Sequence, residues 1–253
     1  MRSPTYSPRS TPAFEWQPRL SVVLPTFNES GNIARLIAAV RDAAHATLDL
    51  EIVVVDDDSA DGTAEIATQC GENVRVIRRT DERGLATAVR RGIEAATGEV
   101  VVVMDTDFNH QPEMIPQMVD FLRYYDLVTG SRFTVGGGME EYGRYRLSFL
   151  FNFFCRLVLG TKLQDHLSGF FAARRESILE LDLDDIFDGY GDYFIRLLVG
   201  ALARGSTVLE VPVYYAARSS GESKTKFLRT LAQYTRAVVR LALRPRPKRP
   251  EIT

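Results

Sequence analysis

The first half of the chain alternates short apolar runs with longer segments in which apolar residues recur every three or four positions. Short runs rich in Val and Ile are typical of buried strands, whereas the longer period indicates helices. Strands are expected at 20–25, 51–56, 74–78 and 99–104, and helices at 30–47, 61–70, 84–97 and 112–124. Because alternating strands and helices build βαβ units, we predict an α/β fold with a mainly parallel central sheet.

The second half of the chain has a less regular pattern. Its expected elements are a strand at 126–131, a triple-glycine loop at 136–138, an aromatic helix at 142–159, a strand at 168–173, a helix at 192–204 and a strand at 207–213. Acidic clusters follow the strands of the first half. We therefore expect nucleotide recognition in the first half and acceptor recognition in the second.

Length and composition bound the domain organisation. With 253 residues and 45% hydrophobic content, the chain can build one sizeable domain, predicted to span 20–223. Residues 1–19 hold four prolines and many Ser and Thr, which indicates a disordered leader rather than a signal peptide. The longest apolar segment, 147–159, is broken by Asn152 and Arg156, so no membrane span is predicted.

The two cysteines of the chain, Cys70 and Cys155, are not part of a Cys-x-x-Cys pattern. Neither a disulfide framework nor a thiolate metal site is therefore indicated. A reducing, cytosolic environment fits this composition.

Charge is distributed unevenly along the chain. Residues 1–217 carry 21 Lys/Arg and 31 Asp/Glu, whereas residues 218–249 carry ten and one. The segment 224–253 is predicted to form a basic amphipathic helix and tail, with an apolar stripe of Phe227, Leu231, Tyr234, Val238 and Leu241. Such a helix suits an anionic membrane surface. The alternative is a helix that docks its stripe on the domain, and nucleic acid is not predicted because no nucleic-acid motif accompanies the charge.

Two carboxylates follow the most apolar predicted strand. Asp105 and Asp107 come after the run 100–104, where open α/β sheets bind ligands. Residues two apart in an extended segment point to the same side, so both can converge on one Mg²⁺ or Mn²⁺ ion, with Asn109 as a third oxygen ligand. Because such ions also bind substrate phosphates, a diphosphate-bearing substrate is predicted. The alternative is that the aspartates only cap the following helix.

Other polar residues follow the first two predicted strands. In the segment 25–29, Phe27 and Glu29 can stack on and hydrogen-bond to a nucleobase, although the same segment can be an ordinary helix start. Asp57 can bind a base N–H or a ribose hydroxyl, or belong to a cluster that caps the next helix. Gly84 opens a helix without Gly-x-Gly-x-x-Gly or Walker spacing, which argues against a nicotinamide enzyme and a P-loop ATPase.

Six motifs occur in a characteristic order. They are Pro25-Thr26-Phe27-Asn28-Glu29, Val55-Asp56-Asp57-Asp58-Ser59, Val103-Met104-Asp105-Thr106-Asp107, Gly130-Ser131-Arg132-Phe133, Asp165-His166-Leu167-Ser168-Gly169-Phe170-Phe171, and Glu210-Val211-Pro212 followed by Arg218 and Gly221-Glu222-Ser223-Lys224. In these motifs the chain resembles the polyprenol (dolichol) phosphate mannosyltransferases of glycosyltransferase family 2. The resemblance runs from Leu20 to about Phe227 and implies a GT-A-like, Rossmann-type sandwich.

The resemblance also implies roles for individual residues. The nucleotide would be held by Pro25, Phe27, Glu29 and Asp57, and the metal by Asp105, Asp107 and Asn109. Acceptor or donor phosphate would be contacted by Arg132, Arg144 with Ser148, Arg218 and Lys224. Asp105, Asp107, Arg132, Arg144 and Arg218 form the implied catalytic set. Asp165 either acts in the site or caps the turn before Ser168.

The implied reaction is an inverting transfer of a hexose, mannose from GDP-mannose, to a polyprenyl or dolichyl monophosphate. A phosphomonoester with a second pKa near 6 is mostly dianionic at neutral pH, so this acceptor needs no strong general base. In agreement, His45, His110 and His166 do not form a nucleophile-activating set. Catalysis would rest on neutralising the leaving diphosphate and on positioning.

Two other readings stay open. One keeps the fold but uses a UDP-sugar such as UDP-glucose, or a soluble acceptor. The other is a nucleotide-sugar-binding subunit without turnover. Because a polyprenyl acceptor stays in the bilayer, we expect a cytoplasmic protein that is peripheral on the cytosolic face of a membrane, held there by its basic helix and the aromatic segment 149–159 or by a membrane-anchoring partner subunit.

Overall fold

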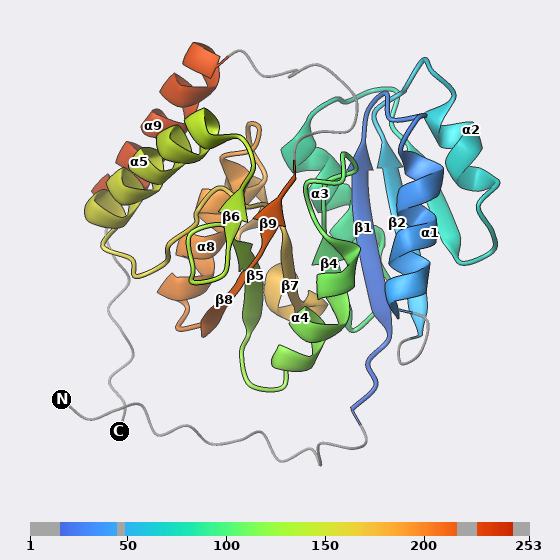
Figure 1. Cartoon of the computed structure of the whole chain (residues 1–253), viewed down its shortest axis with the longest axis horizontal. Coiled ribbons are helices and arrows are strands. Elements are labelled where there is room, and N and C mark those ends of the chain that lie inside the picture. Colours follow the sequence, from blue (N-terminus) through green and yellow to red (C-terminus); the bar gives the residue numbers. More distant parts are fainter. Residues whose placement is uncertain (1–15, 45–48, 217–226, 245–253) are drawn as a thin grey trace.

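The computed structural model describes residues 16–44, 49–216 and 227–244 (Figure 1). The strands are β1 (Leu20–Thr26), β2 (Leu50–Asp56), β3 (Val74–Arg78), β4 (Val100–Val103), β5 (Leu127–Ser131), β6 (Gly138–Met139), β7 (Phe171–Arg174), β8 (Val208–Pro212) and β9 (Tyr214–Tyr215). The helices are α1 (Ile33–Ala44), α2 (Thr63–Thr68), α3 (Leu85–Ala95), the 3₁₀ turn η1 (Pro112–Met114), α4 (Ile115–Phe121), α5 (Tyr142–Leu159), α6 (Arg175–Leu179), α7 (Leu183–Ile186), α8 (Tyr193–Ala203) and α9 (Phe227–Leu243).

Seven strands form the central sheet in the order β3-β2-β1-β4-β7-β5-β8. The pairs among β1, β2, β3 and β4 are parallel, as is the pair of β5 and β8. The predicted α/β fold with a mainly parallel sheet is therefore confirmed. The exception is β7, which runs antiparallel between β4 and β5 and joins the two halves of the sheet.

Both faces of the sheet are covered by helices, which explains why its strands are apolar at successive positions. Val22 and Leu24 of β1 pack into a core beneath α1, α2 and α4. Val23 of the same strand faces a second core formed with α3 and α8. The α3 side is tightly packed, because a Cβ atom at Gly92 would lie only 2.2 Å from the Val23 side chain.

Most predicted elements match the observed ones within a few residues. The predicted end of the domain at 223 lies outside the described residues. Of the predicted leader 1–19, residues 1–15 lie outside the described residues. Trp16 packs against the first core, with the guanidinium groups of Arg123 and Arg174 at 5.8 and 5.3 Å from its ring. Trp16, which lies within the predicted leader, therefore contacts the folded domain, because an aromatic side chain near the sheet finds apolar surface to cover.

Helices α5 and α9 form a separate layer beside α8 (Figure 1). Cys155 and Leu159 of α5, Ile195 of α8 and Val238 of α9 make a third, smaller core. Tyr234, Val238 and Leu241 of the predicted stripe are therefore docked on the domain, as in the second of the two alternatives for this helix, whereas Leu231 is 38% exposed. Among the described residues, no helix combines the length and apolar character needed to cross a membrane.

Candidate active site

The carboxyl ends of β1, β2 and β4 meet at one edge of the sheet (Figure 1). Pro25 of β1 pairs with Val55 of β2, and Val23 pairs with Val103 of β4. The polar loops that follow these strands are consequently neighbours, at the edge where open α/β sheets bind ligands.

Hydrogen bonds join the loops after β1 and β2. The backbone N–H of Asn28 donates to Ser59 Oγ at 2.8 Å, and that of Glu29 donates to Thr63 Oγ1 at 2.9 Å. Asn28 adopts a positive φ of 54°, a conformation that Asn tolerates better than most residues. The two loops therefore form one continuous surface.

Phe27 and Glu29, both predicted to contact the nucleotide, lie in this surface and are half-buried. The guanidinium carbon of Arg83 lies 5.3 Å from the Phe27 ring centroid, in cation–π range. Asn32 Nδ2 donates to the Glu29 carboxylate at 2.9 Å, just before α1 begins. Phe27 thus offers an aromatic face at the sheet edge, whereas Glu29 also serves the start of the helix.

Asp57 is buried and engaged by the protein itself. Its Oδ1 accepts from Arg79 Nε at 2.7 Å and also from Arg79 Nη2, and its Oδ2 accepts from the backbone N–H of Gly84 at 2.8 Å. Arg79 is itself buried and also donates to Thr87 Oγ1. Asp57 therefore anchors the segment between β3 and α3, a structural role that the sequence analysis did not assign to it.

Asp105, Asp107 and Asn109 lie in the loop after β4. The strand ends at Val103 and the chain bends at 106–110, so this loop is not the extended segment that the sequence predicted. Asp107 is instead oriented by Asn109, whose backbone N–H and Nδ2 donate to its two carboxylate oxygens at 3.1 and 2.6 Å. The Asp105 side chain is 44% exposed.

The chemistry of this loop fits a hard divalent cation. Carboxylate oxygens are the ligands that Mg²⁺ and Mn²⁺ prefer, and Mg²⁺ commonly uses one or two of them together with substrate phosphates. Within the described residues no group of three or more His, Cys, Asp or Glu side chains could hold a metal ion. A cation at this edge would thus depend on Asp105, Asp107 and oxygens from Asn109 or the substrate.

On the other half of the sheet, Arg132 follows β5 and forms a buried ion pair. Its Nε and Nη2 donate to the two carboxylate oxygens of Asp165 at 2.7 and 2.8 Å, and its backbone N–H donates at 3.1 Å. Asp165 also accepts from the backbone N–H of Leu167 at 3.0 Å, so it stabilises its own turn as well. Although burial acts to raise it, the pKa of Asp165 is held below its usual range by Arg132.

A buried link of side chains joins the Asp105 loop to Arg132. His110 accepts the backbone N–H of Asp105 at its Nδ1, at 2.8 Å, and its Nε2 lies 2.7 Å from the hydroxyl of Tyr215. The Arg132 guanidinium carbon lies 4.9 Å from the centroid of the Tyr215 ring. The acidic and basic parts of the site are therefore held in one packed unit.

The remaining predicted phosphate-binding residues are spread over two regions. Arg144 and Ser148 lie on α5, where Arg144 is exposed and Ser148 is half-buried. Their spacing of four residues places them on one face of the helix. Arg218 and Lys224 lie outside the described residues.

Helix α5 presents an apolar surface to solvent. Four large side chains spaced along one face are each more than half exposed, namely Tyr142 at 70%, Leu150 at 61%, Phe153 at 55% and Leu157 at 74%. The exposed positions of α9 include Arg236 and Arg240. The two packed helices thus carry exposed apolar side chains on α5 and exposed arginines on α9. Both features are typical of helices that contact membrane surfaces.

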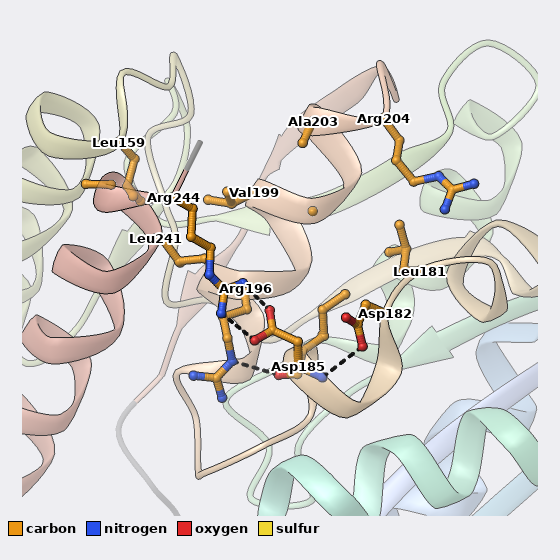
Figure 2. Close-up of a pocket in the computed structure, with 13 residues that line it drawn as sticks. Leu159, Leu181, Asp182, Asp185, Arg196, Val199, Ala203, Arg204, Leu241 and Arg244 are labelled. Carbon is orange, nitrogen blue, oxygen red and sulfur yellow. Dashed lines mark hydrogen bonds and ion pairs between the residues drawn. The ribbon is translucent and has the colours of Figure 1, made fainter. Parts of the chain in front are cut away.

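A cavity of about 340 Å³ lies at the far end of these helices, between α7, α8 and α9 (Figure 2). At its edge both terminal nitrogens of Arg244 donate to the Asp185 carboxylate. Leu159 and Leu241 contribute to its apolar wall. None of its lining residues comes from the loops after β1, β2 or β4, so this cavity belongs to the docking of α9 and not to the candidate active site.

Sequence reasoning missed Arg79, Arg83 and Tyr215. Arg79 and Arg83 follow β3, which lies next to β2 and its acidic loop. Cationic residues after a strand that neighbours an acidic strand end are a signal that could have found them. Tyr215 lies in the two-residue strand β9, for which the hydrophobic pattern has no signature.

Comparison with known proteins adds independent information. Residues 21–182 match the sequence profile of Glycosyl transferase family 2. A dolichol-phosphate mannosyltransferase of Pyrococcus furiosus is 39% identical over 232 residues, which cover 88% of this chain and 63% of that protein. The chain thus spans less than two thirds of that relative. An undecaprenyl-phosphate mannosyltransferase of Micrococcus luteus is 35% identical over 216 residues, which cover 81% of this chain and 87% of that protein.

Among solved structures, glucosyl-3-phosphoglycerate synthase from Mycobacterium tuberculosis, in complex with Mn²⁺, UDP and glucosyl-3-phosphoglycerate, has a similar fold. The TM-score is 0.70 at 24% sequence identity, and the match covers 90% of this chain and 81% of that one. At this identity the likeness concerns the fold alone. It agrees with the predicted GT-A-like sandwich.

Proposed function

We propose that this chain, which belongs to glycosyltransferase family 2, transfers a hexose with inversion from a nucleoside diphosphate sugar to a polyprenyl monophosphate. The donor we propose is GDP-mannose, because two relatives are named for mannosyl transfer to dolichyl or undecaprenyl phosphate. The observation that carries the proposal is the packed unit in which the acidic loop at Asp105 is joined through His110 and Tyr215 to Arg132.

This arrangement suits two substrates that are both anionic. The donor diphosphate and the lipid phosphate repel each other, so the site must neutralise one and hold the other. A divalent cation on Asp105, Asp107 and Asn109 would supply charge neutralisation to the leaving diphosphate. Arg132, Arg144, Arg218 and Lys224 would supply guanidinium and ammonium groups for phosphate oxygens, with the Ser148 hydroxyl as a further donor.

The nucleotide would bind at the joined loops after β1 and β2. Phe27 supplies an aromatic face for stacking, and Glu29 borders the same surface. Pro25 is buried near the end of β1, two residues before Phe27. Because Asp57 is bound to Arg79 and Gly84, we propose that it shapes this surface and contacts the nucleotide only through the edge of its carboxylate.

The lipid phosphate would be its own nucleophile. A largely dianionic phosphate oxygen can attack the anomeric carbon without a base to deprotonate it, while the bond from that carbon to the diphosphate breaks on the opposite face. The protein then contributes orientation and electrostatic stabilisation, which together can lower a barrier by many kcal/mol.

The polyprenyl tail would stay in the bilayer, so the protein must reach the membrane surface. We propose that the apolar face of α5 enters the interfacial region and that Arg236 and Arg240 of α9 contact anionic headgroups. The protein would then be peripheral on the cytosolic face. A membrane-anchoring partner subunit is the alternative means of recruitment.

A donor screen tests this function. The purified full chain would be incubated with Mg²⁺ or Mn²⁺, a short-chain polyprenyl phosphate and either GDP-mannose, GDP-glucose, UDP-glucose or UDP-galactose, and the glycolipid would be identified by mass spectrometry. We expect mannosyl phosphoryl lipid from GDP-mannose at the highest rate. Lipid product from UDP-glucose alone would refute the proposed donor but keep the acceptor, whereas no lipid product from any donor would refute the function.

A further inference from the structure

His110 is fully buried, and its two ring nitrogens bind groups on opposite sides of the candidate site. Nδ1 accepts the backbone N–H of Asp105, which requires an unprotonated Nδ1 and places the ring proton on Nε2. Nε2 lies 2.7 Å from the Tyr215 hydroxyl and 3.1 Å from the carbonyl oxygen of Ser168. Both nitrogens therefore have partners that match this one tautomer.

The ring of His110 is also fixed by packing. It stacks on Phe170 with centroids 4.9 Å apart and an interplanar angle of 11°, and it meets the Tyr215 ring edge-on at 5.2 Å. The Tyr215 hydroxyl lies 3.0 Å from both the carbonyl oxygen and the Oγ of Ser168. Rotation of the imidazole would break its stacking on Phe170 and its contacts with Asp105 and Tyr215 together, so its nitrogens are held in place.

The backbone at Asp105 needs such support because it lies beyond the end of β4. The last regular residue of that strand is Val103, and no helix begins until η1 at Pro112. Asn109 orients Asp107 from within the same loop. The next residue, His110, binds the backbone of the other carboxylate-bearing residue, so two consecutive side chains hold the two aspartates.

We propose that His110 is a positioning residue that sets the geometry of Asp105 toward the cation and the donor diphosphate. This inference rests on the proposed function, because it assumes that Asp105 and Asp107 hold a divalent ion. Its distinguishing feature is the Nδ1 contact. A histidine that only fills the core would be replaced by another flat ring without loss at the site.

Three variants separate these roles. His110→Phe keeps the stacked ring and removes both nitrogens, whereas His110→Asn keeps an oxygen near the position of Nδ1 that can accept the Asp105 N–H. His166→Phe is the matched control, because His166 is also buried but its Nε2 bonds to Thr161. Each protein would be titrated with Mn²⁺ in the presence of GDP or UDP, with free Mn²⁺ measured by electron paramagnetic resonance, and its thermal unfolding recorded.

The expected result is a loss of Mn²⁺ affinity of about 10- to 100-fold in His110→Phe, the range typical for residues that orient metal ligands. His110→Asn should recover most of that loss. His166→Phe should bind Mn²⁺ like the unaltered chain even if it unfolds at a lower temperature.

Each outcome bears on a different claim. Unchanged Mn²⁺ affinity in folded His110→Phe would overturn the positioning role and leave the proposed function intact. Equal losses in His110→Phe and His166→Phe would also overturn it, because the effect would then be general destabilisation. No Mn²⁺ binding by the unaltered chain with either nucleotide would overturn both the metal assignment and this inference, whereas failure of lipid transfer alone would refute the function and leave the inference standing.

Discussion

The two halves of the central sheet hold their charged side chains differently at the same edge. In the half built from β1 to β4, aspartates follow β2 and β4, and the Asp105 side chain is 44% exposed. In the half that starts at β5, the guanidinium of Arg132, which we propose contacts a substrate phosphate, is buried against Asp165. The antiparallel strand β7 joins the halves. The solvent-facing carboxylate and the buried ion pair thus make separate contributions that can be tested one at a time.

A second contrast lies within the first half. Asp57 and Asp105 both follow strands, but Asp57 is neutralised by the buried Arg79, whereas Asp105 is held through its backbone and its carboxylate reaches solvent. Position at a strand end is therefore not enough to assign a carboxylate to a ligand. The contacts within the protein must be known as well: Asp57 is bound by Arg79, whereas Asp105 Oδ2 lies 3.8 Å from Nε2 of His110.

The largest expected effect comes from removing the acidic half of the site. Asp105→Ala and Asp107→Ala should each lower the transfer rate by about 10³-fold, because the proposed cation would stabilise the leaving diphosphate by several kcal/mol. The measurement is the rate of glycolipid formation at saturating donor, with and without chelator. Asp184→Ala, at an exposed ion pair with Arg90, is the control and should retain full activity. Full activity of both aspartate variants would refute the proposed role of Asp105 and Asp107 in metal binding.

Removing Arg132 tests whether its ion pair with Asp165 stabilises the fold. Arg132→Ala leaves the Asp165 carboxylate buried without its ion-pair partner and should reduce the free energy of unfolding by about 3–5 kcal/mol, measured by urea denaturation. The companion variant with both Arg132→Met and Asp165→Leu should lose much less stability. If the single variant is as stable as the unaltered protein, the ion pair does not stabilise the fold.

The same ion pair predicts a pH dependence. Because the pKa of Asp165 is lowered in the folded state, its contribution to stability is present above the unfolded-state value, near 4, and is lost as the pH falls through the lower folded value. The double variant should lack this loss. Parallel unfolding curves at pH 7 and at about pH 3 would check it, and equal pH dependence in both proteins would contradict it.

Arg144 sharpens the comparison because it is basic but exposed. Arg144→Ala should leave unfolding nearly unchanged and raise KM for the lipid phosphate about 10- to 100-fold, as expected for loss of charge-assisted hydrogen bonds worth about 1.5–3 kcal/mol. Arg146→Ala, two residues along the same helix, is the matched control. Steady-state kinetics with each substrate varied in turn would decide. An increase in KM for the donor alone would assign Arg144 to the donor side.

The smallest expected effect concerns the separate contributions of α5 and α9 to membrane binding. Replacing Leu150 and Phe153 with Ser should lower binding to anionic vesicles by about tenfold at any salt concentration, because each side chain contributes about 1 kcal/mol or less of new burial. Replacing Arg236 and Arg240 with Gln should weaken binding only at low salt, because charge attraction is screened. Sedimentation with vesicles checks both. Equal salt dependence of the two pairs would mean that α5 does not enter the interface.

The sequence predicted the βα elements well because their signal is local. Apolar runs and helical spacing located β3 at Val74–Arg78 and α5 at Tyr142–Leu159. Other features depend on which segments become neighbours. The antiparallel pairing of β7, the two-residue strands β6 and β9, and the capture of Asp57 by Arg79 all require the fold to be assembled first.

The two helices of the outer layer illustrate the same limit. An amphipathic pattern shows that α9 has an apolar stripe, but it does not say what covers the stripe. Val238 is buried against α5 and α8, whereas Phe153 of the neighbouring helix stays 55% exposed. Asp105, Asp107 and Arg132 were proposed as site residues from motifs, while the contacts of His110 and Tyr215 with them required the structure.

The central claim is that a lipid phosphate is the acceptor. A competition between two acceptors tests this claim directly. The full chain would receive GDP-mannose and UDP-glucose with Mn²⁺ and equal concentrations of a short polyprenyl phosphate and 3-phosphoglycerate, and the products would be resolved by mass spectrometry and the anomeric configuration by NMR. We predict hexosyl phosphoryl lipid with inverted configuration and no sugar on phosphoglycerate. Glycosylated phosphoglycerate without lipid product, or lipid product with retained configuration, would contradict the account.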